Sequence, residues 1–262
     1  MGLIGDPVAH SLSPRMQNAA FAARGLDWAY VPLRVEAPRL EAAFAGLVAL
    51  GFAGANVTIP HKTAAVAFCD ELDEVAERAG SVNTVAVRDG GLHGSSTDGL
   101  AVTEAVAAAG ARVLLLGAGG AAQAVATALV DAGVASLTVA ARRADQADAL
   151  AARLRTVAPA AEIEASASWP PDAGEATLVV QATPVRDAPL VSLSPGQAVV
   201  DLSYRADGRP TALVEAARAA GCADVIDGLE VLVRQGAASF ARWTGVDAPL
   251  DVMRAAVRSP SG

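Results

Sequence analysis

Short apolar runs alternate with longer segments of helical spacing through most of the chain. The runs RVLLLG (112–117) and SLTVAA (136–141) are typical of buried strands, and each precedes an Ala-rich segment typical of a helix. Further strands are expected at 54–59, 177–183 and 197–203. In residues 159–175 the apolar positions follow neither the strand nor the helix spacing, so this segment is predicted to be an irregular excursion at the surface. Strands that alternate with helices predict parallel sheets with crossover helices, and therefore an α/β fold.

Local signals set the limits of several elements. Ser13 is expected to be the N-cap of a helix that has Pro14 at its first position. Residues 28–35 alternate between apolar and polar and predict a strand, whereas residues 63–79 predict a helix. The turn Asp89-Gly90-Gly91 predicts a hairpin between two short strands.

One segment has the composition of a membrane span. Residues 113–130 carry no charge and are about as long as a short transmembrane helix. Gly117, Gly119 and Gly120 interrupt the segment after a short apolar run, so a strand, a turn and a helix explain it better. We therefore expect a cytoplasmic protein that does not enter a membrane.

Composition and charge exclude several classes. The chain has 262 residues, is 53% hydrophobic and has a net charge of −8, with no tract polar enough to indicate disorder. A nucleic-acid partner is not expected, because such proteins present a basic face. The two cysteines have no CxxC spacing and the three histidines are scattered, so neither a disulfide framework nor a metal site is expected.

The glycine-rich stretch after the strand at 112–117 predicts a dinucleotide site. Gly117-x-Gly119-x-x-Ala122 lies between a strand and a helix, where glycine permits a tight turn and close approach of a pyrophosphate to the helix N-terminus. Ala-Gly-rich helix starts also occur for packing alone, and that alternative stays open. The expected cradle is formed by Gly117, Ala118, Gly119, Gly120 and Ala121.

The end of the next strand indicates which dinucleotide binds. An NAD site has an acidic residue there, which binds the ribose hydroxyls. This chain has Arg142 and Arg143 at that position, and their guanidinium groups suit a 2′-phosphate. NADP is therefore favoured. Asp145 follows closely and could serve as the acid of an NAD site instead.

The first half of the chain carries polar side chains in apolar surroundings. Lys62 follows the expected strand at 54–59 and could donate a proton to a carbonyl oxygen if another group orients it. A solvated surface lysine is the alternative. The full set suits a ligand with several hydroxyls and a carboxylate, and consists of Ser11, Ser13, Asn56, Thr58, Lys62, Asn83 and Asp98.

These motifs, taken together, resemble the shikimate dehydrogenase family over nearly the whole chain. The resemblance is carried by GDPVAHSLSPRMQNAAF, GANVTIPHK, AGSVNTV, STDG, LLLGAGGAA, VVDLSYRADGRPT and DGLEVLVRQGAASFARWTG. It implies NADPH-dependent, reversible reduction of 3-dehydroshikimate to shikimate, a step of aromatic amino acid and chorismate biosynthesis. It also implies that Lys62 and Asp98 are the catalytic pair.

The resemblance assigns the remaining site residues. It implies that shikimate is bound by Ser11, Ser13, Asn56, Thr58, Asn83, Tyr204 and Gln235. It extends the cofactor set to Thr183 and Gly228. The chain departs from the family where Asn-Arg-Thr is usual, because Ala141 precedes the two arginines, and where Gly-Met is usual, because it has Arg186-Asp187.

The implied architecture has two domains. Residues 1–100 form an α/β substrate domain, residues 101–230 form a Rossmann-type, doubly wound NADP domain, and residues 231–262 form helices that return to the first domain. A monomer or homodimer is expected. Three alternatives stay open: a quinate/shikimate dehydrogenase that uses NAD, a sensor that binds the cofactor without turnover, and a folate-type dehydrogenase of similar plan.

Overall fold

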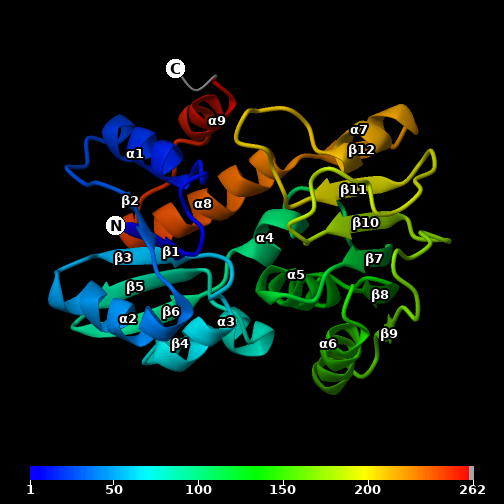
Figure 1. The fold of residues 1–262 in the computed structure, drawn as a ribbon, viewed down its shortest axis with the longest axis horizontal. Coiled ribbons are helices and arrows are strands. Elements are labelled where there is room, and N and C mark those ends of the chain that lie inside the picture. Colours follow the sequence, from blue (N-terminus) through cyan, green and yellow to red (C-terminus); the bar gives the residue numbers. More distant parts are fainter. Residues whose placement is uncertain (260–262) are drawn as a thin grey trace. The chain divides into compact units, whose positions relative to one another are not determined.

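The computed structural model describes residues 1–259 (Figure 1). The chain divides into two compact units. Unit 1 consists of Met1–Asp98 together with the chain from Leu232 onward, and unit 2 consists of Gly99–Val231. Each unit has its own sheet and its own hydrophobic core.

Unit 1 is built on a six-stranded mixed sheet. Its strands are β1 (Gly2–Gly5), β2 (Val31–Arg34), β3 (Gly54–Val57), β4 (Glu71–Leu72), β5 (Thr84–Arg88) and β6 (Gly91–Ser95), in the order β2-β1-β3-β5-β6-β4. Strands β1, β2 and β3 are parallel, and β5 is antiparallel to both β3 and β6. The expected hairpin is confirmed, with positive φ at Asp89 (51°) and Gly90 (78°), as a type I′ turn requires.

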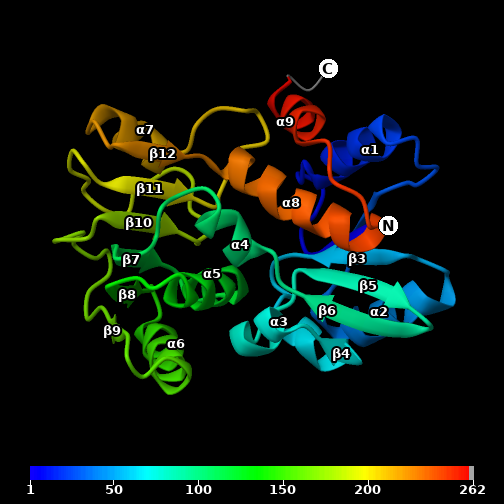
Figure 2. The same cartoon turned by 180° about the vertical axis from the view of Figure 1, so that it is seen from behind.

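Helices pack on both faces of this sheet (Figures 1 and 2). They are α1 (Ser13–Ala23), η1 (Ala37–Arg39), α2 (Leu40–Ala49), η2 (Ala64–Phe68), α3 (Glu74–Ala79) and α8 (Gly228–Thr244), of which the first four residues belong to unit 2. Helix α9 (Leu250–Arg258) packs against α1. Phe44 of α2 belongs to the core with Ile4 and Val57 on one face. On the other face Phe21 of α1 stacks on Phe240 of α8, with ring centroids 5.4 Å apart.

Unit 2 is built on a six-stranded parallel sheet. Its strands are β7 (Arg112–Leu116), β8 (Ser136–Ala140), β9 (Glu162–Ala165), β10 (Leu178–Gln181), β11 (Ala198–Asp201) and β12 (Asp224–Ile226). Its helices are α4 (Asp98–Thr103), α5 (Gly120–Asp131), α6 (Ala144–Val157) and α7 (Ala212–Ala219). The order β12-β11-β10-β7-β8-β9 is that of a doubly wound Rossmann fold, with its switch point between β7 and β10. The predicted α/β class is confirmed.

Several local predictions were wrong. Ser13 is the first helical residue of α1 and Leu12 is the N-cap, so the N-cap prediction is off by one position. Residues 63–79 form η2, β4 and α3 rather than one helix, because Asp73 caps α3 through Ala76 N–H and β4 pairs with β6. The expected surface excursion at 159–175 contains β9, and the short strand β12 had no clear sequence signal.

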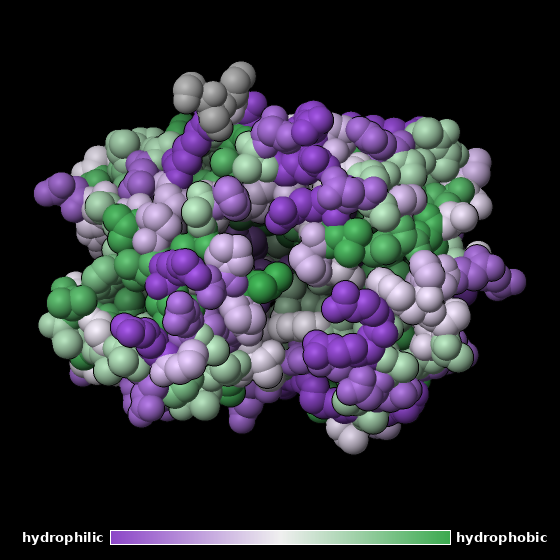
Figure 3. Space-filling view, viewed as in Figure 1, coloured by the Kyte–Doolittle hydropathy of each residue, from purple (hydrophilic) through white to green (hydrophobic). Residues whose placement is uncertain are grey.

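The uncharged segment at 113–130 forms β7, the glycine turn and α5, as predicted. Within residues 1–259 no helix is long and apolar enough to span a bilayer. On the face drawn in Figure 3, hydrophilic side chains lie among hydrophobic ones rather than in separate regions.

Candidate active site

The polar residues of the first half of the chain lie at one end of the strands in the unit 1 sheet. The carboxyl ends of the parallel strands β1 and β3 lie side by side, with Ile4 paired to Val57. Because β5 runs antiparallel to β3 and β6, its first residue, Thr84, lies at the same edge and pairs with Ser95 at the end of β6. The loops that follow β3 and β6, and the residue before β5, therefore meet.

The Lys62 ammonium and the Asp98 carboxylate form an ion pair at this edge. Lys62 Nζ lies 2.5 Å from Asp98 Oδ2, and their side chains are 14% and 8% exposed. The loop before Lys62 is fixed by His61, whose ring lies 2.6 Å from the Val35 carbonyl oxygen. Lys62 is also the single lysine among the 20 basic Lys and Arg residues of the sequence. The solvated-lysine alternative is thereby ruled out, because this ammonium is largely buried against a carboxylate.

Asn83 connects this pair to the sheet. Its Nδ2 donates to Asp98 Oδ1 at 2.8 Å, and its Oδ1 accepts from the Thr97 backbone N–H at 2.9 Å. A backbone N–H can only donate, so the amide oxygen of Asn83 must face Thr97 and its NH₂ group must face the carboxylate. The two oxygens of Asp98 are thus divided between Asn83 and Lys62.

Gln235 and Asn56 lie next to Asn83. The Gln235 Oε1 atom lies 3.5 Å from Asn83 Nδ2, and its backbone carbonyl accepts from Thr97 Oγ1 at 3.0 Å. The Asn56 side chain is 5% exposed. Both ends of its amide already have partners in the protein, among them Tyr30 Oη at 2.8 Å.

Ser11 lies in the loop that follows β1, Ser13 is the first residue of α1, and Thr58 directly follows β3. The Ser13 backbone N–H donates to Ser11 Oγ at 3.2 Å. The Thr58 backbone N–H donates to the Ile4 carbonyl at 2.8 Å. A Cβ on Gly5 would lie 2.4 Å from Thr58 Cγ2, so the close approach of these loops requires glycine at the end of β1.

This arrangement can perform acid–base chemistry. An ammonium group held by a carboxylate can donate a proton to a developing alkoxide and take it back in the reverse direction. Amide and hydroxyl groups beside it supply hydrogen-bond partners for a ligand rich in hydroxyls. Within residues 1–259 no group of three or more His, Cys, Asp and Glu side chains could hold a metal ion.

The glycine turn of unit 2 lies at the switch point of its sheet, between β7 and α5. Gly117 has φ of 118°, and a Cβ on it would lie 3.1 Å from the Ala182 backbone, so both conformation and space require glycine. Gly119 precedes α5, and a Cβ there would meet no atom within 4 Å. The backbone next to the helix N-terminus is therefore open to a bulky anionic group, which fits a pyrophosphate.

The other predicted cofactor residues lie on loops of unit 2. Arg142 and Arg143 follow β8 and are exposed. The Thr183 carbonyl, after β10, accepts from Ser203 Oγ at 2.6 Å. A Cβ on Gly228 would lie 2.1 Å from the Ser203 carbonyl oxygen, so Gly228 packs directly on the loop that carries Tyr204.

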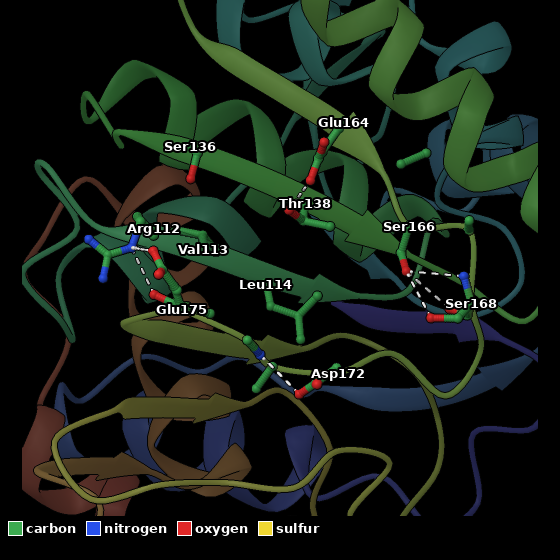
Figure 4. A pocket seen from close by; sticks show the side chains of 15 residues that line it. Arg112, Val113, Leu114, Ser136, Thr138, Glu164, Ser166, Ser168, Asp172 and Glu175 are labelled. Carbon is green, nitrogen blue, oxygen red and sulfur yellow. Dashed lines mark hydrogen bonds and ion pairs between the residues drawn. The ribbon is translucent and has the colours of Figure 1, made fainter.

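A cavity of about 550 Å³ opens elsewhere on the unit 2 sheet (Figure 4). It lies at the first residues of β7 and β8 and under the loop from Ser166 to Ala176. Among its polar side chains, Thr138 Oγ1 donates to Glu164 Oε1 at 3.3 Å and Arg112 Nε lies 4.0 Å from Glu175 Oε2. Dinucleotides bind at the carboxyl ends of such strands, so this cavity is not the expected cofactor site.

Sequence reasoning missed several buried polar residues near the pair. Thr97 belongs to the STDG motif, and its position directly before Asp98 was an available signal. Tyr30, Thr84 and Ser239 gave no signal, because each meets its partners through the tertiary fold.

A doubly wound unit with an open glycine turn and a second unit with a buried Lys–Asp pair define a two-unit, dinucleotide-dependent oxidoreductase. Three family models match the chain: the shikimate dehydrogenase substrate binding domain over residues 3–85, shikimate/quinate 5-dehydrogenase over residues 100–184, and the shikimate 5′-dehydrogenase C-terminal domain over residues 228–258. The chain belongs to the shikimate dehydrogenase family.

Individual relatives support this assignment over full length. Shikimate dehydrogenase (NADP(+)) of Anaeromyxobacter sp. (strain Fw109-5) is 47% identical, covering 99% of this chain and 95% of the relative. The enzyme of the same name from Rubrobacter xylanophilus is 46% identical, covering 98% and 94%. The crystal structure of shikimate 5-dehydrogenase from Thermus thermophilus in complex with NADP(H) and shikimate is 35% identical, with a TM-score of 0.84 and coverage of 98% and 97%.

Proposed function

We propose that this protein catalyses the reversible, NADPH-dependent reduction of 3-dehydroshikimate to shikimate, a step in the biosynthesis of chorismate and the aromatic amino acids. The observation that carries the proposal is the buried ion pair between Lys62 and Asp98, with Asn83 bonded to the same carboxylate. Full-length relatives that share the name shikimate dehydrogenase (NADP(+)) support the reaction and the cofactor.

Unit 1 binds the substrate in this proposal. Shikimate carries a carboxylate and three hydroxyl groups, which need donors and acceptors at fixed positions. The residues proposed to supply them are Ser11, Ser13, Thr58, Asn83 and Gln235, and Tyr204 is a further proposed substrate residue. A ligand that lacked one of the matching hydroxyls would leave a protein polar group unpaired, which costs about 1–3 kcal/mol.

Lys62 and Asp98 perform the proton chemistry. Bound NADPH supplies the hydride to the carbonyl carbon of the substrate. The Lys62 ammonium donates a proton to the carbonyl oxygen as that oxygen gains negative charge, and the neutral amine takes the proton back in the oxidation of shikimate. Asp98 holds the ammonium in place through Oδ2, 2.5 Å away, and is itself held by Asn83.

Unit 2 binds NADPH in this proposal. The backbone from Gly117 to Ala121, at the N-terminus of α5, would hold the pyrophosphate, because free N–H groups and the helix dipole favour an anion there. Arg142 and Arg143 bind the 2′-phosphate, because guanidinium groups pair with phosphate through two parallel hydrogen bonds. Thr183 and Gly228 complete the cofactor set.

Location and assembly are further parts of the proposal. We place the enzyme in the cytoplasm as a monomer or homodimer, acting on small molecules. Cell fractionation with an antibody against the chain tests the location, and light scattering coupled to size-exclusion chromatography tests the assembly.

The reaction itself is tested with a matrix of substrates and cofactors. Purified protein is mixed with shikimate or quinate and with NADP or NAD, and formation of the reduced cofactor is followed by absorbance. We expect the highest kcat/KM with shikimate and NADP. Preferred turnover of quinate with NAD would indicate a quinate/shikimate dehydrogenase instead. A lack of turnover with every pair would indicate a sensor that binds the cofactor without catalysis.

A further inference from the structure

All asparagines of this protein lie on one path of hydrogen bonds in unit 1. The sequence contains three, Asn18, Asn56 and Asn83. The path begins at α1, where Asn18 Oδ1 accepts from the Tyr30 backbone N–H at 2.7 Å and Asn18 Nδ2 donates to the Tyr30 carbonyl at 2.9 Å. Asn18 therefore fixes the backbone of Tyr30 through both of its polar groups.

The path continues through the side chain of Tyr30. Its hydroxyl donates to Asn56 Oδ1 at 2.8 Å. Asn56 Nδ2 donates to the Asn83 carbonyl oxygen at 2.9 Å. A carbonyl can only accept, so this bond sets which end of the Asn56 amide is the nitrogen, and the Tyr30 hydroxyl must donate to the other end.

Ser239 and Thr84 complete the surroundings of Asn56. Its Nδ2 lies 3.0 Å from Ser239 Oγ and 3.1 Å from Thr84 Oγ1. Ser239 Oγ also lies 2.7 Å from Thr84 Oγ1, and Thr84 Oγ1 donates to Asn83 Oδ1 at 2.9 Å. Ser239 belongs to α8, four residues after Gln235, and its Oγ lies 3.0 Å from the Gln235 carbonyl oxygen.

The path ends at the ion pair. Asn83 is held at its backbone carbonyl by Asn56 and at its amide oxygen by Thr84 and Thr97. Its Nδ2 then donates to Asp98 Oδ1, so the direction of the carboxylate depends on groups that do not touch it.

Burial makes these bonds strong constraints. The exposed fractions are 1% for Tyr30 and 0% for Thr84 and Ser239. Water cannot replace a missing partner at such positions. Removing the Tyr30 hydroxyl takes away the donor to Asn56 Oδ1. Removing the Ser239 hydroxyl takes away one of the three acceptors around Asn56 Nδ2 and a partner of Thr84 Oγ1, so either loss changes how the Asn56 amide is held.

We propose that Asn18, Tyr30, Asn56 and Ser239 are positioning residues that set the orientation of Asn83 and, through it, of the Lys62–Asp98 pair. In this proposal Asn56 acts through Asn83 rather than by binding substrate. The kinetic part of the inference rests on the proposed function, whereas the structural part does not.

The structural part is tested by NMR with selective ¹⁵N-asparagine labelling of the whole chain, which gives three side-chain NH₂ groups. Tyr30→Phe and Ser239→Ala each delete one hydroxyl from the path. Ser81→Ala is the matched control, because Ser81 Oγ is buried and has no hydrogen-bond partner among residues 1–259. We expect both path variants to move the NH₂ signals of Asn56 and Asn83, and the control to leave both in place.

The kinetic part is tested with the same variants. A lost buried hydrogen bond corresponds to about a five- to tenfold effect, so kcat for shikimate should fall by about that factor in Tyr30→Phe and Ser239→Ala. The KM for NADP should not change, because unit 2 is untouched. The pH profile of kcat should shift in both variants and not in Ser81→Ala, because only the path sets the geometry of the ion pair.

The double variant Tyr30→Phe/Ser239→Ala should lose less than the product of the single losses, since both hydroxyls act through the Asn56 amide. The proposal is overturned if the Asn83 signals do not move, or if kcat and its pH profile match the Ser81→Ala control while only the melting temperature falls. A wild-type protein that does not turn over shikimate refutes the proposed function instead, and the NMR experiment still decides whether the path orients Asn83.

Discussion

Lys62 Nζ lies 2.5 Å from Asp98 Oδ2, although 36 residues separate the two along the chain. The sheet of unit 1 explains this contact. Lys62 follows β3 and Asp98 follows β6, and the antiparallel strand β5 between them brings both loops to one edge. The order and direction of these strands therefore bring the Lys62 and Asp98 side chains together.

Substitutions at two glycines of unit 2 should have separate effects, one on cofactor binding and the other on stability. A Cβ on Gly119 would meet no atom within 4 Å, whereas a Cβ on Gly228 would lie 2.1 Å from the Ser203 carbonyl oxygen. We expect Gly119→Ala to keep the melting temperature and to weaken NADPH binding, because its methyl group occupies the space of the pyrophosphate. Calorimetric titration and thermal unfolding measure the two effects.

Gly228→Ala should instead lower the unfolding free energy by about 1–3 kcal/mol, the usual cost of forcing an extra carbon into packed structure. Equal melting temperatures for the two variants would mean that the backbone around Ser203 moves to make room for the added carbon. Unchanged NADPH affinity in Gly119→Ala would place the pyrophosphate away from this turn.

Arg142 should distinguish the two nicotinamide cofactors. If its guanidinium binds the 2′-phosphate, Arg142→Ala should raise the Kd of NADPH about ten- to hundredfold, as loss of a charge-assisted hydrogen bond does, and leave that of NADH nearly unchanged. Arg218→Ala, an exposed arginine on α7, is the control for a general change in charge. Equal weakening of both cofactors would show that Arg142 does not contact the phosphate.

Asp201, at the end of β11, should make stability depend on pH. Burial raises the pKa of its carboxyl to about 6, although hydrogen bonds from Thr211 and Ser203 act in the opposite direction. The unfolded chain loses this proton near its ordinary pKa of 3.8, whereas the folded protein retains it to about 6. Between these two pKa values the folded state binds more protons than the unfolded chain. The free energy of unfolding should therefore fall as the pH rises from about 4 to about 6, by up to about 3 kcal/mol from this group.

Asp201→Asn tests this dependence. The amide cannot ionise, so the variant should gain stability relative to the wild type as the pH rises through that window, measured by equilibrium unfolding in urea. Asp148→Asn, which changes an exposed carboxylate on α6, should keep the wild-type dependence. Parallel curves for Asp201→Asn and the wild type would rule out a buried, protonated Asp201.

The sequence predicted the features that local rules control. The turn at Gly117 and the hairpin at Asp89-Gly90 follow from backbone conformations that only a few residue types adopt, and both are present. The division of residues 63–79 was missed, because β4 exists only through its pairing with β6, which no local pattern encodes.

The same limit applies to the site. Lys62 and Asp98 could be proposed because their motifs are compact, and the presence of only one lysine was a further signal in the sequence. Asn56 and Ser239 meet although 183 residues separate them. Their hydrogen bond depends on the docking of α8 against the sheet, so a reading of residue types along the chain could not find it.

The proposed reaction depends on proton exchange between Lys62 and the substrate, and the variant Lys62→Arg isolates that step. Arginine keeps the positive charge beside Asp98 but does not release its proton at the working pH. With shikimate and NADP we expect kcat to fall about 10²–10⁴-fold in Lys62→Arg, as far as in Lys62→Ala, while calorimetry shows shikimate still bound. If Lys62→Arg retains kcat within a few-fold of the wild type, Lys62 supplies only charge and the proposed mechanism is wrong.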